Sequence, residues 1–402
     1  MNLPAALSQR GDIRLGYRCN ARCGFCYYQD SLDNPVDKEP TTAVLLDRIA
    51  RLRAAGATEI EFTGGEPTIR PDLMALIRHA AALGFVNISM ITNGLRLAKR
   101  SFADAVIDAG VNDVLFSVHG HTAAVHDLHT GIPGSFTRIM AAVRNVGNRG
   151  VRRRSTTTIT GYNCAHTEDI VGFVIGLGMD CIHLSVFSPV NEAKGTDAGM
   201  CVRYSDAAAA IKRAIDAHKS ELPPLSVKYI PFCFMTGYEN YVMNLYQQSF
   251  DPDDWNYYLS NKVRRADTSL KRAAFDAVAL AGAALAKSCS TVRVHGWAGV
   301  KVLGFTRIAE LVRKKRVSAC RSCRYDVVCD HAWKEYVVRY GEEEFSPVHG
   351  PKILDPAWCY DLARYRRPGV RVTTRGASRQ PRAPEISPTV AGASPGAAAT
   401  RS

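Results

Sequence analysis

The stretch Tyr-Arg-Cys-Asn-Ala-Arg-Cys-Gly-Phe-Cys at residues 17–26 carries Cys19, Cys23 and Cys26 in the spacing C-x3-C-x2-C. Three thiolates this close in sequence can converge on one metal centre. A structural zinc ion takes four protein ligands, and a four-iron cluster is normally held by four cysteines. Three local cysteines leave one iron of such a cluster open to another ligand. The alternatives are a zinc loop that borrows a distant ligand, and three buried free thiols.

The cysteine stretch follows the first of six short apolar runs, each of which precedes a stretch with helical spacing. The alternation predicts βαβ units and a parallel sheet, with ligands bound at the carboxyl ends of the strands. Periodicity alone does not decide between an open sheet and a barrel. The expected strands are Ile13–Tyr17, Glu59–Phe62, Val86–Ile91, Val114–Val118, Arg154–Ile159 and Cys181–Phe187, and the expected helices lie in 41–55, 71–83, 102–109, 136–146, 168–177 and 205–218.

Three further strand ends carry glycines or short polar residues. The second strand ends in Phe-Thr-Gly-Gly-Glu-Pro-Thr at residues 62–68, the third in Ile-Thr-Asn-Gly at 91–94, and the fourth in Ser-Val-His-Gly at 117–120. Gly64 and Gly65 allow the backbone to approach a ligand closely, because no side chain intrudes. Asn93 and Ser117 place polar groups at neighbouring strand ends. An ordinary strand-to-helix turn and turn capping are the alternatives.

These four motifs, in this order and at strand ends, resemble the radical S-adenosylmethionine (radical SAM) enzymes across about residues 12–190. The resemblance implies a partial (βα)6 TIM-like barrel. It also implies a [4Fe-4S] cluster on Cys19, Cys23 and Cys26, with the open iron bound by the amino and carboxylate groups of SAM. The residues that the resemblance assigns to binding of SAM are Phe25, Gly64, Gly65, Glu66, Asn93 and Ser117.

A second group of cysteines, Cys320-x2-Cys323-x5-Cys329, resembles part of the auxiliary-cluster region called SPASM, or its shorter relative twitch. The full SPASM pattern has another cysteine at the place that Trp333 occupies here. We therefore expect at most one auxiliary [4Fe-4S] cluster. Its fourth ligand is Cys233, Cys289 or Cys359, of which we favour Cys233. A structural zinc ion on the same thiolates is the alternative.

Four histidines, His119, His121, His126 and His129, lie within the loop that follows the fourth strand. Such a density of histidines is compatible with a metal site. We favour a simpler interpretation, because related radical SAM sequences carry a comparable Ser-x-His-Gly, His-Asp and Thr-Gly stretch. One of these histidines is then expected to line the substrate pocket.

Charge and composition divide the 402 residues into three parts. The net charge is +13, but residues 364–402 hold eight arginines and one acid, which leaves about +6 for the rest. We expect a core at 1–220, an extension with the auxiliary site at 221–363, and a disordered basic tail at 364–402. No secretory signal or membrane-spanning run is found, so we expect a cytoplasmic protein with no membrane partner.

The reaction that the resemblance implies is reductive cleavage of SAM to a 5′-deoxyadenosyl radical, which abstracts a hydrogen atom from the substrate. The protein would be an oxidoreductase or a related radical enzyme, and it would need a one-electron reductant such as flavodoxin or ferredoxin. We favour a small biosynthetic intermediate as substrate, since the first strand near residue 12 leaves no room for a peptide-recognition domain. Alternatives are a peptide maturase, an RNA-modifying enzyme that uses the basic tail, and a non-catalytic zinc module.

Overall fold

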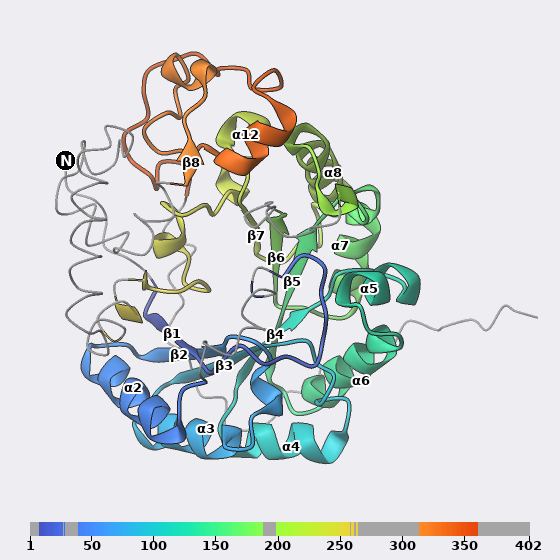
Figure 1. Cartoon of the computed structure of the whole chain (residues 1–402), viewed down its shortest axis with the longest axis vertical. Coiled ribbons are helices and arrows are strands. Elements are labelled where there is room, and N and C mark those ends of the chain that lie inside the picture. Colours follow the sequence, from blue (N-terminus) through green and yellow to red (C-terminus); the bar gives the residue numbers. More distant parts are fainter. Residues whose placement is uncertain are drawn as a thin grey trace, which may run out of the picture. The chain divides into compact units, whose positions relative to one another are not determined.

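The computed structural model (Figure 1) describes residues 8–26, 28, 39–187, 198–257, 259, 260, 263 and 313–360. In this part of the chain, seven parallel strands form one sheet in the order β1 to β7. The sheet curls into a half-barrel with helices along its outer side (Figure 1), which confirms the expected α/β partial barrel. The strands are β1 Arg10–Arg14, β2 Glu59–Thr63, β3 Asn87–Thr92, β4 Asp113–Ser117, β5 Arg152–Ile159, β6 Cys181–Val186 and β7 Leu225–Lys228.

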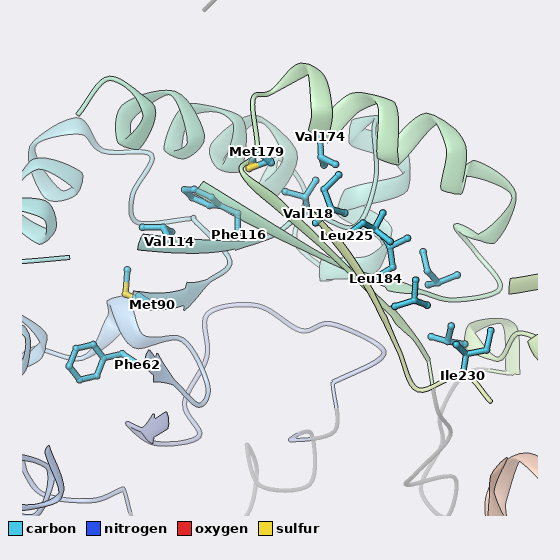
Figure 2. Packing of buried hydrophobic residues seen from close by; sticks show 14 of the residues in the cluster. Phe62, Met90, Val114, Phe116, Val118, Val174, Met179, Leu184, Leu225 and Ile230 are labelled. Carbon is cyan, nitrogen blue, oxygen red and sulfur yellow. The ribbon is translucent and has the colours of Figure 1, made fainter. Parts of the chain in front are cut away.

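Helices cross between successive strands and bury their apolar faces against the outer face of the sheet. Figure 2 shows part of this layer, in which Phe62, Met90 and Phe116 project from β2, β3 and β4. Burial of such side chains contributes about 1.5–3 kcal/mol each. The helices are α2 Thr42–Ala54, α3 Leu73–Ala82, α4 Arg100–Ala109, α5 Ala123–Thr130, α6 Ser135–Gly147, α7 Thr167–Gly176 and α8 Tyr204–Ala217.

The inner face of the sheet is charged at the amino ends of the strands. Arg10 of β1 pairs with Glu59 of β2 at 2.9 Å and with Asp113 of β4 at 3.3 Å. Arg154 of β5 pairs with Glu61 at 2.6 Å and with Asp113 at 2.7 Å. All five side chains are buried, and a buried charge is tolerated only when it is paired in this way.

The chain after β7 connects the two edges of the half-barrel. Val242 forms a backbone bridge with Val227 of β7, and Trp255 forms one with Arg10 of β1. The indole nitrogen of Trp255 also donates a hydrogen bond to Glu61 on the inner face. Residues 242–255 therefore run from one edge strand to the other and cover the charged inner residues.

The structure corrects the sequence prediction in three places. β1 is Arg10–Arg14 rather than Ile13–Tyr17, because its charged residues face the inner network and interrupt the apolar pattern. β7 extends the sheet past residue 220, in a segment whose periodicity fails. Helix α5 forms where we expected a loop, because its buried face is made of His126 and His129. The tail that we expect at 364–402 lies outside the described residues.

The described C-terminal segment packs against α8 and the chain that follows β7. It holds the short antiparallel strands β8 Lys314–Lys315 and β9 Ala332–Trp333, followed by helix α12 Lys334–Tyr340. The ring of Tyr336 in α12 stacks on that of Tyr204 in α8, with centroids 3.8 Å apart. Among the described residues, no helix combines the length and the apolar character that crossing a membrane requires.

Candidate active site

The cysteine loop leaves β1 and is held at both ends by main-chain hydrogen bonds. The amides of Gly65 and Glu66, after β2, donate to the carbonyl oxygens of Gly16 and Arg18, each at 2.9 Å. At the other end, the amide of Arg22 donates to Thr130 O at 2.9 Å, and Gly24 donates to His129 O. The loop is therefore fixed between the carboxyl end of β2 and the last turn of α5.

The two glycines after β2 are required by the approach of this loop. A Cβ atom on Gly65 would lie 2.0 Å from Arg18 O, and one on Gly64 would lie 2.4 Å from Gly16 O. Gly64 also has a φ of +125°, which residues with side chains rarely adopt. The close approach that the sequence predicted is thus made to the cysteine loop itself, and contact of these glycines with SAM stays a prediction.

The three thiols of the loop are half-buried and close enough to influence one another. Burial raises the pKa of the Cys19 thiol to about 11 and that of Cys23 to about 12, and the neighbouring thiols contribute to both shifts. Burial also raises the pKa of Cys26. Three thiolates together therefore need a positive charge, which a metal centre supplies, and the residues fit a cluster.

Glu66 connects the ends of β2 and β3 through its buried carboxylate. Oε1 accepts hydrogen bonds from the hydroxyls of Thr68 at 2.6 Å and Thr92 at 2.7 Å, and Oε2 accepts one from the amide of Asn93 at 2.8 Å. Burial raises the pKa of Glu66, and these hydrogen bonds oppose that effect. The carboxylate is engaged by the protein, so its direct binding of SAM stays a prediction.

Asn93 joins β3 to the cysteine loop. Its side-chain nitrogen donates to Asn20 Oδ1 at 2.8 Å and lies 3.8 Å from the sulfur of Cys19. Its side-chain oxygen accepts a hydrogen bond from the amide of Leu95 at 3.1 Å. Ser117 lies half-buried at the end of β4, beside Thr156 of β5. Asn93 thus holds the loop, and the binding of SAM by Asn93 and Ser117 stays a prediction.

The histidines after β4 pack against the cysteine loop. The rings of Phe25 and His119 meet edge to face, with centroids 4.6 Å apart, and His126 stacks on His119. Nδ1 of His126 accepts a hydrogen bond from the amide of His119, and His129 bonds to Thr160. Burial lowers the pKa of His126 to about 4 and that of His119 well below its usual value. These three residues form a neutral packing layer behind Phe25.

A second group of thiols lines a pocket between the chain after β7 and the C-terminal segment. The pocket brings together the three cysteines of the C-terminal motif and the fourth that we favoured. Burial raises the pKa of Cys233 to about 12 and that of Cys320 to about 11. Burial, with Cys233 nearby, also raises the pKa of Cys329. The four thiols are Cys233, Cys320, Cys323 and Cys329.

The other two candidates for the fourth auxiliary ligand differ from Cys233. The thiol of Cys359 donates a hydrogen bond to Glu239 O at 3.4 Å and is not among the residues that line the pocket. Cys289 lies outside the described residues. Trp333, which occupies the place of a further SPASM cysteine, is buried under Lys314, whose nitrogen lies 3.5 Å from the centroid of its ring.

Sequence reasoning missed the residues that hold the cysteine loop. Asn20 and Thr92 lie within or beside recognised motifs, but the pattern did not show that they contact Asn93 and Glu66. Thr130 and Gly131 were noticed only as part of a Thr-Gly pair. A Cβ atom on Gly131 would lie 2.7 Å from Arg22 O, so this glycine also makes room for the loop.

The site combines a half-barrel of parallel strands with three cysteines that follow the first strand. Residues 13–174 match the family model of the radical SAM superfamily. These residues are therefore similar to a radical SAM domain, and the cofactors of such a domain are a [4Fe-4S] cluster and SAM.

Similar proteins are named as cyclases and synthases. A probable GTP 3′,8-cyclase of Metallosphaera sedula is 30% identical over 186 residues, which are 46% of this chain and 57% of that protein. An AdoMet-dependent heme synthase of Oleidesulfovibrio alaskensis is 30% identical over 175 residues, 44% of each chain. The solved structure of Streptococcus suis SuiB bound to SAM is 18% identical, with a TM-score of 0.46, over 55% of this chain and 51% of that one. The chain spans about half the length of the curated relatives it matches.

Proposed function

We propose that this protein cleaves SAM reductively at a [4Fe-4S] cluster held by Cys19, Cys23 and Cys26, and acts on a small biosynthetic intermediate. The observation that carries the proposal is the fixed three-cysteine loop at the carboxyl ends of the strands. Its main chain is bonded to the ends of β2 and α5, so the three thiols are held in place before any cofactor binds.

When bound, a reduced cluster would supply one electron to the sulfonium of SAM, whose C–S bond would break to give methionine and a 5′-deoxyadenosyl radical able to remove a hydrogen atom from the substrate. The chain's own residues place and shield this chemistry. Asn93 and Glu66 fix the loop from the side of β3, and the histidine layer supports Phe25 from α5. A flavodoxin or a ferredoxin is the class of partner that we expect to supply the electron.

We further propose that Cys233, Cys320, Cys323 and Cys329 hold one auxiliary [4Fe-4S] cluster. Four thiols that line one pocket satisfy the usual ligand count of a cubane. A structural zinc ion on the same four thiolates is the alternative, and iron and sulfide analysis distinguishes the two.

Two observations support a small molecule as the substrate. The relatives with about 30% identity are named for reactions that concern GTP and heme, which are small molecules. In addition, β4, β5 and β6 carry half-buried hydroxyl side chains towards their carboxyl ends, on Ser117, Thr156, Thr158 and Ser185. Such groups suit a polar ligand of limited size.

Anaerobic reconstitution with iron and sulfide tests the proposal. We expect about eight irons per chain, which is the content of two four-iron clusters. Addition of SAM and a strong reductant should release 5′-deoxyadenosine. A colourless protein that contains zinc and no iron, or no 5′-deoxyadenosine from the brown protein, would contradict the proposal. GTP and porphyrins are the first substrates to test for a product that depends on SAM.

A further inference from the structure

His121, His166 and Asp169 form a cluster that the proposed reaction does not use. One potential ligand atom from each lies within 4.8 Å of the others, and in the described part of the chain no other three such groups are this close. His121 follows β4, His166 follows β5, and Asp169 lies in the first turn of α7. We propose that these three side chains bind a divalent transition-metal ion such as Zn²⁺.

The distances between the three groups differ from those of hydrogen-bonded pairs. Oδ2 of Asp169 lies 4.0 Å from Nε2 of His121 and 3.7 Å from Nδ1 of His166. A direct hydrogen bond would bring such atoms to about 2.7–3.2 Å. Ligands at about 2.1 Å from one ion lie about 3.4 Å apart. A small inward rotation of the side chains therefore brings them onto an ion.

The lone pairs that coordination requires are available. In the described part of the chain, Nδ1 of His121 is buried without a hydrogen-bond partner, so no hydrogen bond occupies this nitrogen. The side chain of His121 is 24% exposed, while those of His166 and Asp169 are 43% and 61% exposed. An ion can enter from solvent on the side of His166 and Asp169. Two histidines and one carboxylate suit zinc, iron or nickel, and leave a position for water.

One buried residue holds the two histidine-bearing segments together. Asn163 is fully buried, and its side-chain nitrogen donates to His119 O at 3.0 Å and to Thr158 O at 2.9 Å. Its carbonyl oxygen accepts a hydrogen bond from the amide of His166 at 2.9 Å. The segments that carry His121 and His166 are therefore fixed in position relative to each other, as a preorganised metal site requires.

His218 and Glu221 provide a matched control. They are also a histidine and a carboxylate three residues apart on the surface, but Nδ1 of His218 lies 3.1 Å from Oε1 of Glu221, as in a direct hydrogen bond. This pair has no second histidine within ligand distance among the described residues. The His218→Ala variant thus removes a surface histidine and its ion pair without touching the proposed site.

Zinc binding to the reconstituted full-length protein tests the proposal. The protein is dialysed anaerobically against micromolar ZnCl₂, and zinc and iron per chain are counted by mass spectrometry. We expect one zinc ion in wild type and in His218→Ala. In His121→Ala and Asp169→Asn we expect at least a tenfold weaker affinity, which is the loss seen even for partners outside the ligand set.

Iron content separates loss of the site from loss of the fold. Asp169 is exposed, so Asp169→Asn should keep the iron content of wild type and lose only zinc. Equal zinc affinity in wild type, His121→Ala and Asp169→Asn would overturn the proposal, as would the absence of any bound zinc in wild type. Neither result affects the proposed cleavage of SAM, which is measured through 5′-deoxyadenosine.

Discussion

The two cysteine groups of this protein are built in different ways. The first consists of three thiols within eight residues of one loop, and main-chain hydrogen bonds hold that loop against two other elements. The second consists of four thiols, of which Cys233 is distant in sequence from the other three. Three ligands leave a cluster with one open iron, and four ligands close it. On the proposed assignment, ligand number alone distinguishes a cluster with an open iron from one whose four irons are all bound by the protein.

Loss of a ligand in the first group should have the largest effect. We expect Cys23→Ala to abolish 5′-deoxyadenosine formation, because two thiolates do not hold the cluster that binds SAM. The measurement is 5′-deoxyadenosine by liquid chromatography after anaerobic reduction. Cys164→Ala is the control, since Cys164 lies outside both groups, packed against the core. Product at the wild-type level from Cys23→Ala would refute the assignment of the first group.

Loss of a ligand in the second group should separate the two clusters. We expect Cys233→Ala to contain about four irons instead of about eight and still to cleave SAM. Cys359→Ala should keep the full iron content, because its thiol bonds to Glu239 O and does not line the pocket. Iron and sulfide analysis measures both variants. If Cys359→Ala loses iron and Cys233→Ala does not, the fourth ligand is assigned wrongly.

A backbone clash should disturb the first group without touching the second. In Gly65→Ala the new Cβ would meet Arg18 O at 2.0 Å, and main-chain atoms cannot move aside cheaply. We expect a loss of about 1–3 kcal/mol in the free energy of unfolding and a lower iron content. Gly176→Ala is the control, because a Cβ there has no neighbour within 4 Å. Thermal unfolding and iron analysis distinguish the two variants, and an unchanged Gly65→Ala would show that the loop lies elsewhere.

A lost side-chain hydrogen bond should have the smallest effect. Asn93→Ala removes the bond to Asn20, which we expect to cost about 0.5–1.5 kcal/mol and to slow 5′-deoxyadenosine formation several-fold. Asn145→Ala removes bonds to Leu97 O and Ala98 O, and should cost similar stability at an unchanged rate. The two variants are compared by chemical denaturation and by initial rates. Equal rates would mean that Asn93 does not position the loop.

Sequence reasoning succeeded where the determinants are local. The three thiols of the first group lie in one loop, so their spacing is visible in the sequence. The apolar residues on the outer faces of β2 to β6 form short runs, which predicted these strands. It failed where a contact joins distant residues. The start of β1 was mispredicted because it contains Arg10, which is buried in ion pairs on the inner face. A charged residue in the sequence normally indicates an exposed position, so it did not indicate a buried strand. The pairing of Asn20 with Asn93 leaves no local signal, since 73 residues separate them.

The main-chain anchoring of the cysteine loop has a consequence for how this protein tolerates mutation. Arg18, Arg22 and Gly24 contribute amide or carbonyl groups to the bonds that hold the loop, and such bonds survive a change of side chain. Substitutions are not tolerated at the glycines that face the loop, because an added Cβ atom would meet the loop's backbone. These glycines are Gly64, Gly65 and Gly131. We therefore expect the residues between the cysteines to vary among related sequences. The glycines that face the loop should be retained, although they contribute no reactive group.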